Sequence, residues 1–249
     1  MTEPLLQVLG LNKRFGAVAA SRDLSFSVNH GEIHGLIGPN GAGKTTAINQ
    51  LCGELKPDSG SIRFDGRDIT RLPVHARARM GLARSFQITF IFEHLSTEQN
   101  LALAIQAHEG HSFRFWGRAD RDRRLIGPTR QILERVGLEA RAGEPASHLS
   151  HGEKRQLEVG MALAGQPKIL LLDEPMAGMG PGGTVELSRL IQELKGTLAI
   201  LLVEHDMDVV FSLADRVTVL DYGQAIATGS PQEIRSNPVV RRAYLGEEA

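Results

Sequence analysis

Residues 38–45 read Gly-Pro-Asn-Gly-Ala-Gly-Lys-Thr and fit the phosphate-binding loop pattern G-x-x-x-x-G-K-[ST]. An alternating apolar run from Ile33 to Ile37 precedes this loop, and a helix-compatible run from Thr46 to Cys52 follows it. Glycines let backbone N–H groups turn inward around a polyphosphate, and a helix N-terminus adds partial positive charge. The sequence therefore predicts a polyphosphate site, in which Lys44 reaches the β- and γ-phosphates and the Thr45 hydroxyl holds Mg²⁺.

The bulk composition is that of a globular protein without a membrane span. The chain has 249 residues, 41% hydrophobic and 23% charged, and its formal net charge of −1 gives no reason to expect a nucleic-acid partner. Its longest apolar runs, Ile169–Leu172 and Leu198–Val203, are far shorter than a bilayer-spanning helix. The first residues lack the pattern of a signal peptide. The single cysteine, Cys52, fits a reducing cytoplasm, and its apolar neighbours predict a buried, inert thiol.

The periodicity of apolar residues divides the chain into an α/β core and a helical insertion. Strand-like runs alternate with helical stretches before residue 89 and after residue 162, which predicts a mainly parallel sheet flanked by helices. Between them the period becomes helical, beginning at a capping box formed by Ser96 and Gln99. We therefore expect a nucleotide-binding core of residues 1–89 and 162–249 and a helical subdomain of residues 90–161.

An apolar strand that ends in two carboxylates supplies the second candidate site. Residues 169–172 are Ile-Leu-Leu-Leu, and Asp173 and Glu174 follow directly. Ligands collect at the carboxyl edge of a parallel sheet, so this position predicts Asp173 as an Mg²⁺ ligand and Glu174 as the residue that polarises an attacking water. The plainer alternative is a buried strand followed by a solvated acidic turn. The phosphate loop earlier in the chain favours the catalytic interpretation.

Three further segments carry signals that are weak alone. Residues 149–156 contain a helix start in which Ser150 and Glu153 form a capping box, so a second phosphate-facing helix N-terminus is expected there. Gln87 lies at the joint between core and helical insertion, and His205 follows the apolar strand 198–203. An isolated glutamine or histidine is usually structural or merely exposed, and only its place in the chain raises its interest here.

The order of loop, Gln joint, second helix start, acidic strand end and His resembles that of the ATP-binding cassette (ABC) ATPases over essentially the whole chain. The resemblance implies a P-loop NTPase (RecA-like) core with an N-terminal antiparallel β subdomain and an inserted α-helical subdomain. It implies ATP and Mg²⁺ as cofactors, with Thr45, Gln87 and Asp173 at the metal. It also implies that Glu174, His205 and Gln87 serve catalysis.

The same resemblance assigns the residues that hold the nucleotide. Phe15 matches the aromatic residue that stacks on adenine, and the loop matches at Gly38, Asn40, Gly41, Ala42, Gly43, Lys44, Thr45 and Thr46. Ser150, His151 and Gly152 match the signature that contacts the γ-phosphate bound to a second subunit. Two positions depart from the family pattern. A second signature glycine and a glutamine are replaced by His151 and Glu153, and Gly180 stands where the family commonly has Asp.

Short sequence segments resemble particular subgroups of this family. Residues 83–87 and the tail 237–246 look like those of the ATP-binding subunits of branched-chain amino-acid importers, and residues 151–153 and 177–179 are similar to the urea or amide type. The resemblance implies a second ABC ATPase subunit, the same or different, two integral membrane permeases and, indirectly, a periplasmic solute-binding protein. It implies a peripheral location at the cytoplasmic face of the plasma (inner) membrane.

Other protein classes are also considered for this chain, and one segment has no assigned role. A soluble ABC ATPase of a non-transport assembly complex is the main alternative, whereas a GTPase or small-molecule kinase lacks the further motifs those classes use. Residues 111–124 mix arginines with Phe113, Phe115 and Trp116, and are expected either to be a solvated surface or to contact membrane subunits or anionic headgroups. Stacking of these aromatic residues on RNA is a weaker alternative.

Overall fold

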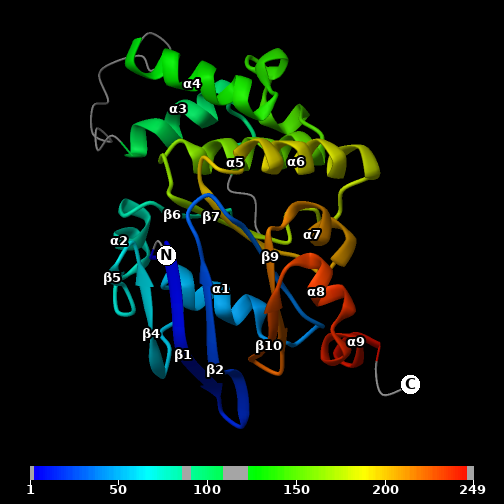
Figure 1. Cartoon of the computed structure of the whole chain (residues 1–249). Helices are drawn as coiled ribbons and strands as arrows, with labels where there is room; N and C mark the ends of the chain where they lie inside the picture. The colour runs from blue at the N-terminus through cyan, green and yellow to red at the C-terminus, as the bar shows by residue number, and fades with distance from the viewer. Residues whose placement is uncertain (1–2, 86–90, 109–122, 246–249) are drawn as a thin grey trace. The chain divides into compact units, whose positions relative to one another are not determined.

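The computed structural model describes residues 3–85, 91–108 and 123–245, and the chain forms two compact units. The first unit is made of Met1–Arg84, Lys168–Glu174 and Leu194–Ala249, and the second of Ser85–Pro167 and Pro175–Glu193. Figure 1 follows their elements along the chain from blue to red. The expected domain borders at residues 89/90 and 161/162 stay a prediction.

The first unit begins with an antiparallel sheet in the strand order β2-β1-β4-β5. Its strands are β1 (Leu6–Phe15), β2 (Val18–Val28), β4 (Ser59–Phe64) and β5 (Arg67–Asp68). The Asp65-Gly66 pair joins β4 to β5 with φ angles of 50° and 72°, both positive as a tight hairpin turn requires. This sheet confirms the antiparallel β subdomain that the resemblance implies.

A second, mainly parallel sheet has the strand order β10-β9-β3-β8-β7-β6. Its strands are β3 (Ile33–Ile37), β6 (Leu82–Ser85), β7 (Ile169–Asp173), β8 (Ala199–Val203), β9 (Arg216–Asp221) and β10 (Gln224–Gly229). Strands β3, β7, β8 and β9 pair in parallel, and β10 is antiparallel to β9. Every residue of β3, β7 and β8 is buried, as expected for a parallel sheet covered on both faces.

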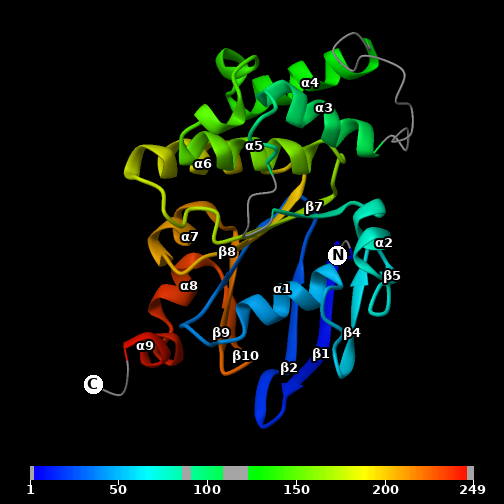
Figure 2. The ribbon, with the colours of Figure 1, turned by 180° about the vertical axis from the view of Figure 1, so that it is seen from behind.

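Helix α1 (Lys44–Cys52), which follows the phosphate loop, lies between the two sheets of the first unit. It contacts β2 of the antiparallel sheet and β7 of the parallel sheet (Figure 2). Its Ile48 and Leu51 belong to one hydrophobic core with residues of both sheets. The remaining helices of this unit are α2 (Val74–Arg79), α7 (Met207–Leu213), α8 (Pro231–Ser236) and α9 (Pro238–Leu245).

The second unit is helical. In the residues that the structure describes, it contains α3 (Thr97–His108), α4 (Arg123–Val136), α5 (His151–Leu163), most of α6 (Pro181–Leu194) and the 3₁₀ turns Glu139–Arg141 and Ala146–His148. Helices α3, α4 and α5 pack on one another. The predicted capping box before α3 is confirmed, since the Ser96 amide donates to Gln99 Oε1 at 2.9 Å and the Gln99 amide donates to Ser96 Oγ at 3.2 Å.

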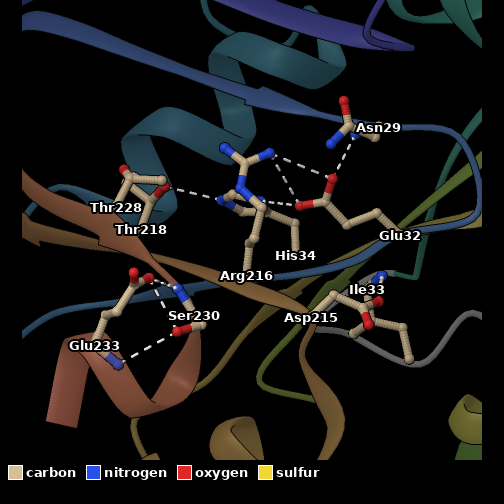
Figure 3. A network of polar contacts seen from close by, with 10 residues as sticks. All are labelled: Asn29, Glu32, Ile33, His34, Asp215, Arg216, Thr218, Thr228, Ser230 and Glu233. Carbon is tan, nitrogen blue, oxygen red and sulfur yellow. Dashed lines mark hydrogen bonds and ion pairs between the residues drawn. The ribbon is translucent and has the colours of Figure 1, made fainter. Parts of the chain in front are cut away.

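A polar chain with Glu32, His34 and Thr218 at its buried centre links β3 to β9 and β10 just before the phosphate loop (Figure 3). His34 is fully buried, and its Nδ1 lies 2.8 Å from Glu32 Oε1 while its Nε2 lies 2.9 Å from Thr218 Oγ1. The Thr218 hydroxyl in turn lies 2.9 Å from that of Thr228. Arg216 Nη1 lies 3.4 Å from Glu32 Oε1. These contacts satisfy polar groups whose burial would otherwise be unfavourable, and so favour β9 as one neighbour of β3.

Candidate functional site

The phosphate loop joins β3 to α1 through backbone conformations that favour glycine. Gly41 and Gly43 have φ angles of 82° and 101°. A Cβ atom on Gly43 would lie 2.4 Å from the carbonyl oxygen of Ala20, so a side chain there would displace β2 or the loop. Helix α1 begins at Lys44, two residues before the predicted run, and no side chain caps its N-terminus. Its first N–H groups can therefore serve an anion.

Lys44 folds back over the loop from which it extends. Its side chain is buried, and Nζ donates to the carbonyl oxygens of Gly38 at 2.7 Å and Pro39 at 3.2 Å. Burial lowers the pKa of Lys44, and the nearby Glu174 and Asp173 carboxylates act in the opposite direction. The structure thus brings together the predicted loop lysine and the predicted acidic pair. Of the other loop residues, Gly38 and Ala42 are buried, Thr46 is half-buried, and Asn40, Gly41 and Thr45 are exposed.

The acidic pair differs in backbone conformation. Asp173 ends β7 and is 4% exposed. Burial raises the pKa of Asp173 above its usual value, and the opposing effects of Arg84 and Lys44 do not offset this rise. Glu174 has a φ of 48°, in the left-handed region, and its amide donates to the carbonyl oxygen of Val203 at 2.8 Å. Such a conformation costs a non-glycine residue about 1–3 kcal/mol and is concentrated at functional sites. The fold therefore holds Glu174 in a strained position directly beyond the strand end.

Arg84, which the sequence analysis does not single out, contacts Asp173 of the acidic pair. Its Nη2 donates to Asp173 Oδ2 at 3.0 Å from the neighbouring strand β6. Within residues 83–87, Gln87 alone is predicted as a site residue, and it lies outside the described residues. The sequence offers no signal for this pairing, because only the order of strands in the sheet brings Arg84 beside Asp173.

His205 and Phe15 occupy more exposed positions in the first unit. Asp173 is in register with Val203 in parallel strands, so Glu174 and His205 follow neighbouring strands at one sheet edge. The His205 side chain is 62% exposed, and its Nδ1 lies 3.7 Å from Oε2 of the buried Glu204. Phe15 ends β1 and is 52% exposed, with Lys13 Nζ 5.8 Å from its ring centre. An exposed ring at a strand end suits stacking.

The signature residues belong to the second unit. Ser150 is the N-cap of α5, and its side chain and that of Glu153 form the predicted reciprocal capping box. Ser150 and His151 are exposed, and Gly152 is half-buried. Of the segment 111–124, residues 111–122 lie outside the part of the chain that the structure describes.

Comparisons with known proteins assign the family. Residues 21–177 match the ABC transporter family model, and residues 226–249 match a model described as branched-chain amino acid ATP-binding cassette transporter. The chain is 43% identical to the high-affinity branched-chain amino acid transport ATP-binding protein LivG of Salmonella typhimurium, covering 99% of this chain and 100% of LivG. It is 39% identical to the corresponding BraF of Pseudomonas aeruginosa, covering 99% of this chain and 100% of BraF.

Solved structures support the same assignment. The ADP conformation of MJ1267, an ATP-binding cassette of an ABC transporter, matches with a TM-score of 0.87 and 31% identity, covering 99% of this chain and 100% of MJ1267. This likeness confirms the predicted P-loop NTPase fold. Together with the phosphate loop, the acidic strand end and the capped signature helix, it places the chain in the ABC transporter family as one of its ATP-hydrolysing subunits.

Proposed function

We propose that this chain powers the uptake of branched-chain amino acids, or of a related small amide such as urea. The match of residues 226–249 to the branched-chain amino acid cassette model carries this proposal. The likeness to LivG and BraF, which extends over almost the whole chain, supports it.

ATP would be held by groups from several elements. The Phe15 ring would stack on adenine, and the amides of the loop, with Lys44, would surround the phosphates. For this Lys44 must exchange its contacts with the Gly38 and Pro39 carbonyls for phosphate oxygens. Mg²⁺ usually binds one or two protein carboxylates together with phosphates and waters. One carboxylate on Asp173 and one hydroxyl on Thr45, with Gln87, fit that need.

Hydrolysis would depend on positioned groups at the sheet edge. Glu174 would accept a proton from the attacking water, and His205 would donate to the γ-phosphate. Mg²⁺, when bound, would neutralise charge on the β- and γ-phosphates. Ser150, His151 and Gly152 of a second ATPase subunit would contact the same γ-phosphate, so each ATP would be held between two subunits. ATP then favours the closed pair through contacts that ADP lacks.

The cycle of closing and opening would reach two integral membrane permeases through Gln87 and the helical subdomain. A periplasmic solute-binding protein would deliver the solute, and no nucleic acid would take part. In the described part of the chain, none of the helices has the length and apolarity needed to cross a membrane. We infer a peripheral place at the cytoplasmic face of the inner membrane, held by the permeases. None of the likenesses above supports the soluble assembly-complex alternative.

Uptake in the native host tests the proposal. A chromosomal Glu174→Gln replacement should abolish ATP-driven uptake of labelled leucine, isoleucine and valine at micromolar concentration. Loss of urea uptake with leucine uptake intact would assign the amide branch instead. Unchanged uptake of both classes would contradict an importer role. Immunoblotting must show that the variant accumulates like the wild type.

A further inference from the structure

The guanidinium of Arg84 bridges the metal-ligand candidate to the helix that follows the phosphate loop. Nη2 donates to Asp173 Oδ2 at 3.0 Å, whereas Nη1 donates to Asn49 Oδ1 at 2.9 Å and to Glu54 Oε2 at 2.9 Å. Asn49 lies on α1, and Glu54 follows its C-terminus. One side chain from β6 thus links the end of β7 to the helix whose first turn carries Thr45.

Burying the Arg84–Asp173 ion pair requires removing both charges from water, and a gain in folding stability does not explain this arrangement. The Arg84 side chain is 9% exposed and that of Asp173 is 4% exposed. Buried ion pairs often stabilise a protein no more than apolar residues of the same size would. In addition, the Arg84 Nε atom is buried and has no hydrogen-bond partner among the described residues. The Nε donor is thus left unpaired, while Nη1 and Nη2 bind residues of separate elements.

We infer that Arg84 is a positioning residue for the magnesium site, holding Asp173 in the orientation and at the distance from α1 that a shared metal ion requires. This inference rests on the proposed role of Asp173 and Thr45. Arg84 engages Oδ2 of Asp173 and so restricts the rotation of the carboxylate that would serve the ion. Arginine suits this task because its planar guanidinium can donate to two groups that lie in different directions, whereas the lysine ammonium is a point charge.

Nucleotide affinity measured against Mg²⁺ concentration tests the inference without relying on turnover. A non-hydrolysable ATP analogue is titrated calorimetrically into the purified full chain, first with EDTA and then at stepped Mg²⁺ concentrations. Partners that orient metal ligands typically contribute 10–100-fold to metal affinity. Arg84→Gln should therefore raise the half-saturating Mg²⁺ concentration about 10–100-fold, and Arg84→Lys should raise it less. Affinity in EDTA should stay unchanged, because Lys44 and the loop are intact.

Arg77 provides a matched control. It is also buried, and its guanidinium donates to the carbonyl oxygens of Gln50 and Leu51 at the end of α1, but not to Asp173. Arg77→Lys should lower the unfolding midpoint in urea while leaving the Mg²⁺ midpoint at the wild-type value. An Mg²⁺ midpoint equal to wild type in both folded Arg84 variants would overturn the inference, and a lower midpoint would show instead that Arg84 competes with the ion.

Asp173→Asn separates this inference from the function on which it rests. A raised Mg²⁺ midpoint in Asp173→Asn together with a wild-type midpoint in Arg84→Gln would refute only the positioning role. A wild-type midpoint in Asp173→Asn would refute the metal role of Asp173 itself, and with it the basis for the positioning role of Arg84.

Discussion

Arg141 Nε donates to Glu153 Oε1 across 2.8 Å, while the other carboxylate oxygen of Glu153 accepts the Ser150 amide at 2.8 Å. The carboxylate that departs from the family signature is therefore neutralised within its own unit and turned back as a helix cap. Burial raises the pKa of Glu153, but the hydrogen bonds from Ser150 and Arg141 outweigh it and hold that pKa below its usual range. The glutamate keeps its charge without presenting a free carboxylate at the helix N-terminus.

Removing this cap should destabilise the chain modestly. Glu153→Ala is expected to lower the free energy of unfolding by about 1 kcal/mol, the usual contribution of an N-terminal cap. Urea unfolding followed by circular dichroism measures it. Glu233 forms an equivalent capping box with Ser230 at α8, and no arginine contact with it is seen in the described residues. If Glu153→Gln destabilises no more than Glu233→Gln, the contact with Arg141 contributes nothing.

Lys44→Ala should weaken nucleotide binding strongly. Hydrogen bonds to charged groups contribute about 1.5–3 kcal/mol, which corresponds to roughly 10–100-fold in affinity. Calorimetric titration with ADP and with an ATP analogue gives the number. Lys44→Arg, which keeps the charge, serves as the comparison. Wild-type affinity in the alanine variant would remove Lys44 from the phosphate site.

Glu174→Gln should slow ATP hydrolysis while leaving ATP binding intact. A positioned general base typically contributes about 10²–10⁴-fold to the rate. Phosphate release per subunit, measured with the assembled transporter, reports turnover, and an equilibrium ATP-binding assay reports affinity. Glu193→Gln changes an exposed glutamate of α6 in the same way and should hydrolyse ATP normally. Near-normal turnover in Glu174→Gln would exclude it as the base.

The buried network in Figure 3 predicts an acid-sensitive contribution to stability. Burial raises the pKa of Glu32, but hydrogen bonds from His34 and the Asn29 amide, with the Arg216 charge, leave that pKa below its usual value. A group with a lowered folded pKa stabilises the protein above its unfolded pKa, about 4.3 for Glu, and loses that contribution as pH falls through the folded pKa.

Glu32→Gln should therefore cost about 2 kcal/mol near neutral pH, because an amide nitrogen replaces one of the two acceptor oxygens and leaves a buried donor unpaired. The difference from wild type should shrink below about pH 4.3, as the wild-type carboxyl becomes protonated. Urea unfolding at pH 7 and at stepped acidic pH values measures this trend. A difference that does not change with pH would show that Glu32 carries no charge-dependent contribution.

Cys52 should be chemically silent in the folded chain. The side chain is 3% exposed, and burial raises the pKa of its thiol to about 12. Thiolates, not thiols, react with alkylating agents. Mass spectrometry after iodoacetamide treatment at pH 8 should show no adduct on the native protein and one on the urea-unfolded protein. Equal labelling of both forms would contradict the buried position.

Features that depend on neighbouring residues could be predicted from the sequence. The loop at residues 38–45, the helix after it, the strand that ends at Asp173 and the capping boxes at Ser96 and Ser150 were all predictable. Glycine conformations, side-chain caps and apolar periodicity act over a few residues, so they can be recognised without knowing the fold. The order of such segments sufficed to indicate the family.

Which distant groups meet depends on how the strands are ordered in the folded chain. Arg84 and Asp173 are 89 residues apart and join because β6 lies beside β7, and His34 meets Thr218 across 184 residues because β9 lies beside β3. Strand periodicity shows which residues are buried but not which strand is the neighbour. The partners of buried charges, and the strained backbone of Glu174, follow from that order of strands and therefore could not be predicted from the sequence.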